Sequence, residues 1–272
     1  MTLAKEPSRG VPDVSADEIL VSHFTLVAQP GAIEPIVIEG AEGWTSPNVH
    51  PVLSLMRWTT EDEATAATAL DNVLDRFRIE GRGFDWMTGP RCAQAGLLPL
   101  LESRGFIRPP LQVAAMVRHL EPSETPPVPP DGIHIWKVDD PADGRIWSVM
   151  AKGFDIPEDV AAIFHNAYAN PSKLQRTDIY AAAVDGSDTL VGVGYLSYIG
   201  KGPSVLLRVS CTLEGSRGRG IYSAVVKQRL HDAARQGRTQ AFVHAYSEDS
   251  RRCLEHLGFS CAGLLQLHRW RP

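Results

Sequence analysis

The sequence predicts an α/β protein with a mixed sheet, organised as two domains in tandem. The stretch 121–130 contains five prolines, which cannot lie inside a helix or a central strand, and it divides the 272 residues into two parts of ordinary domain size. In the second part, strand-like apolar runs alternate with helical patterns. Each part also contains a helix that ends in Gly-Phe, at Gly105 and at Gly258, before a strand-like run. We therefore predict an internal repeat.

The domain boundaries follow from these features. We predict a disordered N-terminus at 1–13, a first domain at 14–120, a linker at 121–131 and a second domain at 132–272. With 43 % hydrophobic and 22 % charged residues, the composition is typical of a globular protein, and the net charge of −5 disfavours a general nucleic-acid binder. No apolar run reaches the roughly 18 residues that a membrane helix needs. The N-terminus lacks the apolar stretch of a signal peptide. We expect a cytoplasmic protein without a membrane or nucleic-acid partner.

The first domain contains one strong helical pattern, at 61–80. Thr60 and Glu63 form a predicted capping box, and apolar residues recur on one face of the helix behind them. A second helix at about 94–103 is expected to stop at Gly105, and a strand is expected at 112–120. A glycine followed by a hydrophobic residue ends many helices, so the alternative to a repeat is a common helix ending.

The second domain is predicted to follow the order β, α, α, β, β, β, α, β, α, β. Asp140 is the expected N-cap of its first helix and Gly153 the expected end. A turn at 185–188 joins two strands into a hairpin. Strands are predicted at 133–138, 178–184, 190–199, 204–212 and 239–246, and helices at 140–153, 157–169, 220–236 and 247–257.

A glycine- and arginine-rich loop lies between the strand 204–212 and the helix 220–236. Gly218 and Gly220 allow neighbouring main-chain N–H groups to converge, and the start of the helix adds the positive end of its dipole. Arg217 and Arg219 supply positive charge. This pattern predicts a binding site for a phosphate-bearing ligand. The alternative is an ordinary tight turn.

Residues 133–272 resemble the GNAT superfamily of acyltransferases. The loop Arg217-Gly218-Arg219-Gly220-Ile221-Tyr222 is similar to the loop that holds the pyrophosphate of acetyl coenzyme A in that family, and the following strand and the helix ending in Leu257-Gly258-Phe259 arrive in the family's order. The resemblance implies two tandem GNAT-like acyl-CoA N-acyltransferase domains. The first would be degenerate, because no such loop precedes its helix at 61–80.

The resemblance also implies acetyl-CoA as co-substrate and direct transfer of its acetyl group to an amine. The expected contacts with acetyl-CoA are Ser210, Cys211, Thr212, Arg217, Gly218, Arg219, Gly220, Ile221 and Tyr222. Cys211 could form an acyl-enzyme, but a lone cysteine in an apolar strand is more often a buried small hydrophobic residue, and we adopt that interpretation. No cysteine or histidine spacing predicts a metal site.

The proton donor that is usual in the resembled family is missing from this sequence. Where many GNAT members have a tyrosine, this chain has Leu254. Tyr246 and His244, at the end of the strand 239–246, are the candidate replacements, although either could simply pack. His165 could recognise substrate, and a solvent-facing histidine is the preferred interpretation.

The sequence thus predicts an N-acetyltransferase that acts on a small-molecule or peptide amine; the acceptor and the oligomeric state are not assigned. One alternative is a regulatory module that binds acyl-CoA without turnover. Another is transfer from a charged tRNA, which the phosphate loop and the net charge disfavour.

Overall fold

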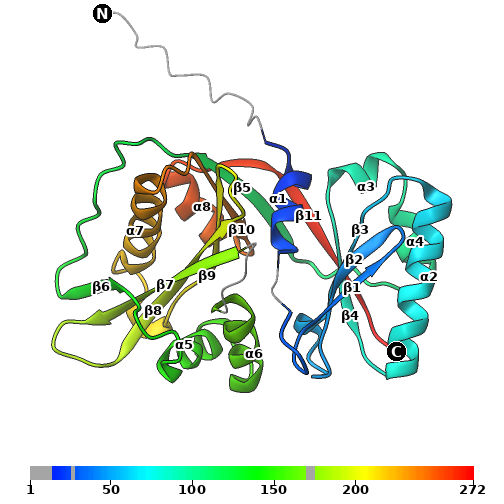
Figure 1. The fold of residues 1–272 in the computed structure, drawn as a ribbon, viewed down its shortest axis with the longest axis horizontal. Helices are drawn as coiled ribbons and strands as arrows, with labels where there is room; N and C mark the ends of the chain where they lie inside the picture. The colour runs from blue at the N-terminus through cyan, green and yellow to red at the C-terminus, as the bar shows by residue number, and fades with distance from the viewer. Residues whose placement is uncertain (1–13, 26–27, 170–174) are drawn as a thin grey trace, which may run out of the picture.

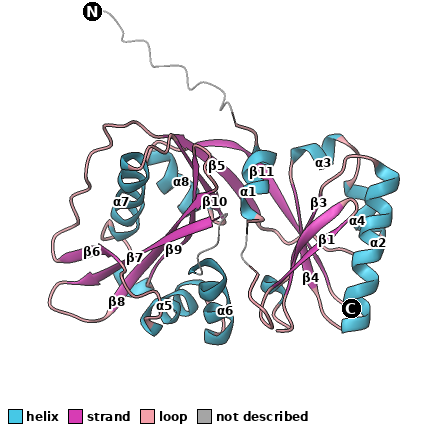
Figure 2. Ribbon diagram, in the orientation of Figure 1, coloured by secondary structure: helices cyan, strands magenta, loops and turns pink. Residues whose placement is uncertain are grey.

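The computed structural model describes residues 14–25, 28–169 and 175–272. Within them, eleven strands form one mixed sheet in the order β1-β2-β3-β4-β11-β5-β10-β9-β8-β7-β6. Figures 1 and 2 show the molecule as two lobes joined through this sheet, with α2, α3 and α4 on one lobe, α5 to α8 on the other, and α1 between them. The α/β class and the mixed sheet predicted from the sequence are confirmed.

The N-terminal half runs from α1 to β5. Helix α2 places Leu70, Val73 and Phe77 against strands of this half, as the periodicity predicts. The elements are α1 (Ala16–His23), β1 (Glu34–Ile38), β2 (Ala41–Thr45), a 3-10 turn at Pro51–Leu53, β3 (Leu55–Trp58), α2 (Glu63–Glu80), β4 (Phe84–Thr88), α3 (Pro90–Gln94), α4 (Leu98–Ser103) and β5 (Gln112–His119).

Two local predictions for this half are wrong. The N-cap of α2 is Asp62, whose carboxylate accepts from the N–H of Thr65 at 2.9 Å, so the capping box of Thr60 and Glu63 does not form. The predicted helix at 94–103 is two short helices, α3 and α4, because Gly96 takes a left-handed conformation with φ of 73° between them.

The C-terminal half follows the predicted order of ten elements. Its first helix, α5, begins one turn later than expected because Asp143, not Asp140, accepts from the first free N–H groups. It continues through Gly153 to the left-handed residue Asp155. The elements are β6 (Ile133–Lys137), α5 (Gly144–Phe154), α6 (Glu158–Ala169), β7 (Gln175–Val184), β8 (Leu190–Ile199), β9 (Ser204–Thr212), a 3-10 turn at Glu214–Ser216, α7 (Ile221–Arg235), β10 (Gln240–Ala245), α8 (Glu248–His256) and β11 (Ser260–Trp270).

The Gly-Phe endings of α4 and α8 have the same geometry. Gly105 and Gly258 are left-handed, with φ of 81° and 83°. The N–H of Phe106 donates to the carbonyl of Leu101 at 3.1 Å, and the N–H of Phe259 donates to the carbonyl of Leu254 at 3.0 Å. Both phenylalanines are buried. This matched closure supports the repeat predicted from the sequence.

The two halves exchange their last strands. Each half has one parallel pair next to the centre of the sheet, β3 with β4 and β9 with β10. Strand β11 pairs antiparallel with β4, and β5 pairs antiparallel with β10. The exchanged strands also pair with each other. Each half therefore has its final strand beside the parallel pair of the other half.

The segment 121–131 crosses the outside of α7 (Figure 1). The carboxylate of Glu124 forms an ion pair with Arg118 at 2.7 Å, and its carbonyl accepts a hydrogen bond from His231 of α7 at 2.8 Å. The sequence boundary predicted here stays a prediction, but the sheet itself is continuous across it.

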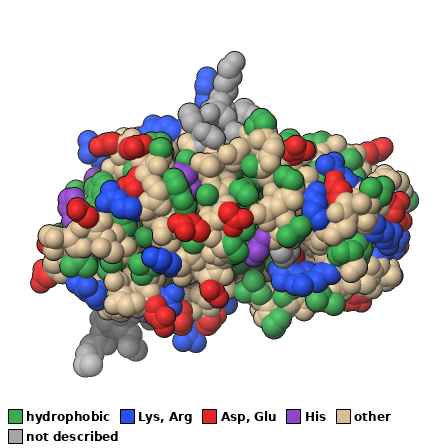
Figure 3. Space-filling view, turned by 90° about the horizontal axis from the view of Figure 1, so that it is seen from below, with side chains coloured by type: hydrophobic (Ala, Val, Ile, Leu, Met, Phe, Trp, Pro, Cys, Tyr) green, Lys and Arg blue, Asp and Glu red, His purple; other side chains and the backbone are tan. Residues whose placement is uncertain are grey.

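In the described residues, no helix is long and apolar enough to cross a membrane. The face in Figure 3 carries acidic and basic side chains interspersed.

Candidate active site

The parallel strands β9 and β10 separate within the C-terminal half. Their pairing ends at Leu207 with Val243, although β9 continues to Thr212 and β10 to Ala245. At the same point β9 contains a bulge. Opposite β8 its register shifts, and Val209 has a positive φ of 49°, which is rare for a β-branched residue. A ligand can lie in the opening between these strands, against main-chain groups of β9 that do not pair with β10.

The glycine- and arginine-rich loop leads from this opening into α7. Gly218 and Gly220 have φ of 75° and 76°, and no side chain of a described residue caps the helix. Within the described part of the chain, none of the main-chain N–H groups of 218–223 donates a hydrogen bond. The Arg217 Nε donates to the carbonyl of Thr212 at 3.2 Å, which ties the loop to the end of β9. Unpaired donors at a helix start are groups that can accommodate an anion.

The other two loop residues are the first of α7. Ile221 is buried in the core. The Tyr222 ring packs against the same core, and its hydroxyl lies 3.2 Å from the Ser250 Oγ of α8. Both side chains are therefore directed into the protein, and only their main-chain N–H groups face the loop where an anion could lie.

The three β9 residues predicted to line the acyl arm face two sides of the sheet. Ser210 accepts a hydrogen bond from Arg229 of α7, and strand alternation places Thr212 on that same side. The Oγ1 of Thr212 is buried and has no partner among the described residues. A buried hydroxyl without a partner fits a hydrogen-bonding ligand beside it.

Cys211 points to the opposite side. Its thiol lies 3.7 Å from the carbonyl of Val149, in space left by Gly153. Burial, the largest cause, raises the pKa of this thiol to about 12. A thiol in this environment stays protonated and is a poor nucleophile, in agreement with the structural role predicted for it.

The two candidate catalytic residues lie in different surroundings. The Nε2 of His244 is buried without a partner among the described residues, and its ring contacts that of His23 in α1 at 4.7 Å. Burial, and then the nearby Arg208 cation, lower the pKa of His244 to about 3. It is therefore neutral at physiological pH, and its contact with α1 favours packing.

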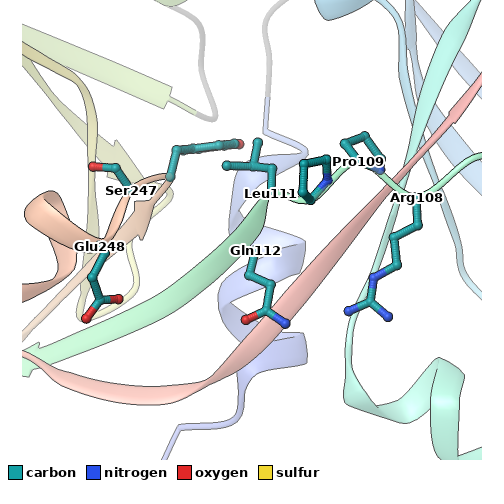
Figure 4. A pocket seen from close by; sticks show the side chains of 8 residues that line it. Arg108, Pro109, Leu111, Gln112, Ser247 and Glu248 are labelled. Atoms are coloured by element: carbon teal, nitrogen blue, oxygen red, sulfur yellow. The ribbon is translucent and has the colours of Figure 1, made fainter.

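Tyr246 lies where β10 ends and is 41 % exposed. The exposure is that of the whole residue; loss of hydration at the hydroxyl, and then the neighbouring Tyr168, raise the pKa of the phenol. It lines a pocket of about 550 Å³ (Figure 4). The segment 108–112 of the N-terminal half forms one wall, and Ser247 and Glu248 form the other. Figure 4 shows Arg108, Gln112 and Glu248 directed to the same side of the pocket. Both halves thus contribute to the opening beside Tyr246.

The corresponding place in the N-terminal half is different. Helix α2 follows β3 there as α7 follows β9. The Asp62 carboxylate occupies its N-terminus, and the hydrogen bond from the Thr65 main chain lowers the pKa of that carboxyl group. A fixed negative charge at this position excludes a phosphate.

One polar residue lies elsewhere than the sequence predicts, and two buried polar residues near the site are not indicated by the sequence. His165 is buried rather than solvent-facing; its ring nitrogens lie 2.6 Å from the Tyr195 hydroxyl and 2.6 Å from the Pro141 carbonyl. Arg208 and Arg229 are buried cations beside the β9 bulge, and no ion pair to an acidic residue is found for either in the described residues. Nothing in the local sequence distinguishes them from surface arginines.

No protein-family model and no curated protein matches the sequence. Solved structures do match. A GCN5-related N-acetyltransferase from Kribbella flavida is 15 % identical with a TM-score of 0.68, over 95 % of this chain and 96 % of its own. A tandem GNAT protein from the clavulanic acid biosynthesis pathway is 14 % identical with a TM-score of 0.66, over 97 % and 89 % of the two chains. A GCN5-related N-acetyltransferase from Sphaerobacter thermophilus is 16 % identical with a TM-score of 0.63, over 96 % and 87 %.

The fold and the local geometry together define a two-lobed α/β protein in which the parallel strands β9 and β10 separate beside a loop whose main-chain N–H groups are unpaired among the described residues. The likeness over nearly the whole chain establishes its fold as the tandem GNAT fold. The resemblance stated from the loop and the Gly-Phe ending is confirmed at this level.

Proposed function

We propose that the protein is an acetyl-CoA-dependent N-acetyltransferase whose C-terminal half binds the co-substrate. The observation that carries this proposal is the unpaired set of N–H groups at 218–223, at the start of α7 and beside the opening between β9 and β10. Arg217 and Arg219 are exposed at the same loop. A pyrophosphate fits such a set of donors and charges.

The acyl arm would lie along β9, past Thr212 toward Ser210. There the main chain of β9 is free of β10, so its N–H groups are available to a thioester oxygen. Because the Cys211 thiol points to the other side of the sheet, transfer would go directly from the thioester to the amine.

The acceptor amine, on a small molecule or a peptide, would enter through the pocket beside Tyr246. Tyr246 would donate a proton to the leaving thiolate: the phenol is protonated at neutral pH, although its raised pKa makes it a weaker acid than a free tyrosine. His244 remains a second candidate for the proton donor, but its low pKa, which leaves the ring neutral at physiological pH, argues against that role.

Calorimetry with acetyl-CoA tests the co-substrate site. We expect one site per chain, because Asp62 occupies the corresponding helix start in the N-terminal half. Arg219→Glu should abolish binding by placing a negative charge beside the pyrophosphate. Arg235→Glu, at the far end of α7, changes the net charge equally and should leave binding intact. Two equivalent sites, or unchanged binding by Arg219→Glu, would contradict the assignment.

A regulatory module that binds acyl-CoA without turnover is the second candidate. It is favoured by Leu254, which fills the position of the missing tyrosine as a fully buried core residue. A panel of amines with detection of released coenzyme A separates the two. Release above the rate of hydrolysis identifies an enzyme, whereas tight binding with no release across the panel favours the module.

A further inference from the structure

Arg229 is a fully buried cation beside the candidate active site. It comes from α7 and has 0 % exposure. Its guanidinium donates to the carbonyls of Val225 at 3.2 Å and Tyr195 at 3.0 Å, and to the Ser210 Oγ at 2.8 Å. No carboxylate pairs with it in the described residues. Burial lowers the pKa of Arg229 to about 10, so the side chain is still charged at neutral pH.

The bulge in β9 and a glycine in β8 make room for this side chain. A further bond runs from Arg229 to the carbonyl of Arg208 at 3.4 Å, immediately before the bulged residue Val209. Gly194 lies under the guanidinium, and a Cβ on it would come within 2.9 Å of the Arg229 Cζ. The strand geometry is therefore matched to a cation directly behind the bulge.

The Ser210 hydroxyl connects this cation to the opening. A serine hydroxyl carries one proton, and the Ser210 oxygen already accepts from Arg229, so its proton is directed to another group. The bond from Arg229 is the one side-chain hydrogen bond found for Ser210 among the described residues, so no acceptor for its proton is present there. Ser210 lies beyond the last β9 residue that pairs with β10, and its side chain is half-buried and reachable. A hydroxyl that accepts from a buried cation is a stronger donor.

We propose that Ser210 donates a hydrogen bond to the carbonyl oxygen of the bound thioester, with Arg229 as the positioning residue that holds and polarises it. This rests on the proposed binding of acetyl-CoA in the opening. Attack of the amine forms a C–N bond while the carbonyl electron pair moves to oxygen, where the Ser210 O–H stabilises the negative charge. When the carbonyl re-forms, the C–S bond breaks and the electron pair leaves on sulfur. Tyr246 protonates the thiolate, and the proton lost by the amine restores the phenol, so the thiol gains one proton and the amine loses one. Ser210 keeps its own proton throughout.

The test observes the carbonyl directly and needs no acceptor. With acetyl-CoA labelled with ¹³C at the carbonyl, the bound resonance of the wild-type protein should lie downfield of the free one. Ser210→Ala should lose most of that displacement, and Ser210→Thr, which keeps a hydroxyl, should retain it. The matched control is Ser204→Ala in the same strand, where the hydroxyl bonds Gln240 outside the opening. With a productive amine, Ser210→Ala should lower turnover about 10²-fold or more, as for loss of an oxyanion donor.

Arg229→Met tests the positioning role, with unfolding curves to establish that the variant is folded. If Arg229→Met loses part of the downfield displacement of the bound carbonyl resonance while Ser210 is still present, the positioning role of the cation is supported. Affinity for coenzyme A without an acetyl group should be unchanged in Ser210→Ala, because that ligand has no carbonyl at this place. A wild-type displacement that persists fully in Ser210→Ala refutes the inference while leaving acetyl-CoA binding intact. Absence of acetyl-CoA binding by the wild-type protein would instead overturn the proposed function and this inference with it.

Discussion

Gly194 provides a stringent test of the buried arrangement around Arg229. In Gly194→Ala, the new methyl group would meet Arg229 Cζ at 2.9 Å and Val225 Cγ1 at 2.9 Å, closer than real Cβ atoms approach other groups. The backbone of Gly194 does not have a positive φ, so the change adds no backbone strain of its own. The effect should therefore come from the lost space over β8.

The expected magnitude follows from two opposing contributions. Overpacking a buried site costs about 1–3 kcal/mol. Replacing glycine by alanine at a permissive backbone position stabilises by about 0.4–1 kcal/mol through the unfolded chain. Displacement of Arg229 would also weaken its 2.8 Å bond to Ser210. We expect a net loss of about 1–2 kcal/mol in the free energy of unfolding, together with a lower turnover.

Urea unfolding of four variants measures this loss: Gly194→Ala, Gly202→Ala, Arg229→Ala and the double variant of Gly194→Ala with Arg229→Ala. Gly202→Ala is the matched control, because the nearest group to its Cβ would be the Ile199 carbonyl oxygen at an ordinary 3.7 Å. It should change stability by less than about 0.5 kcal/mol. In the double variant with Arg229→Ala, part of the clash at Gly194 is relieved, so the two changes should couple by about 0.5 kcal/mol or more. The clash of the new methyl group with Val225 Cγ1 remains in the double variant, so the relief is only partial. If Gly194→Ala were as harmless as Gly202→Ala, the guanidinium would not lie over β8 as described.

Three further predictions concern the assembly, the acid response and the proton donor. Cleavage of the chain within 121–131 should leave the two pieces associated on size-exclusion chromatography, because β5 and β11 each lie in the sheet of the other half; elution as two separate pieces would contradict the strand exchange. Burial lowers the pKa of His23 and of His244, so the unfolded chain binds more protons than the folded chain below about pH 6.5. The free energy of unfolding should therefore fall by up to about 1.4 kcal/mol per pH unit for each histidine as the pH is lowered. In urea unfolding at pH 7, 6 and 5, His244→Gln should reduce this pH dependence, and an unchanged slope would count against the buried neutral His244. Tyr246→Phe should lower turnover by about 10²-fold with nearly unchanged acetyl-CoA affinity if the phenol is the acid, and full activity would leave solvent as the proton source.

Much of the fold could be predicted because its signals are local. The apolar run of β9, the glycines at 218 and 220 and the helical period of α7 lie next to one another in the chain, and the structure keeps them in that arrangement. The Gly-Phe endings at 105 and 258 likewise depend only on a left-handed residue after a helix. Errors were largest at helix starts, where Asp62 and Asp143 compete with nearby polar residues for the same N–H groups.

The rest depends on contacts between distant segments. Nothing near residue 229 indicates that an arginine on an otherwise ordinary helix reaches a bulge in β9, because the bulge and Gly194 lie in other strands. His165 was assigned to the surface because its two hydrogen-bond partners, Pro141 and Tyr195, are 24 and 30 residues away. The strand exchange has no sequence signature, since β5 and β11 are apolar whichever parallel pair they lie beside.

The exchange of β5 and β11 determines the order in which the strand pairs of the two halves can form while the chain is being synthesised. Strand β4, complete at residue 88, has to wait for residues 266–270 before its neighbour exists, a separation of more than a hundred and fifty positions. Until then one long edge of β4 is without its partner strand and is open to pairing with other chains. The C-terminal half has the reverse situation, because β5 is already made when β10 emerges. The lobe that contains the glycine- and arginine-rich loop can therefore close its sheet first, and the other lobe closes last.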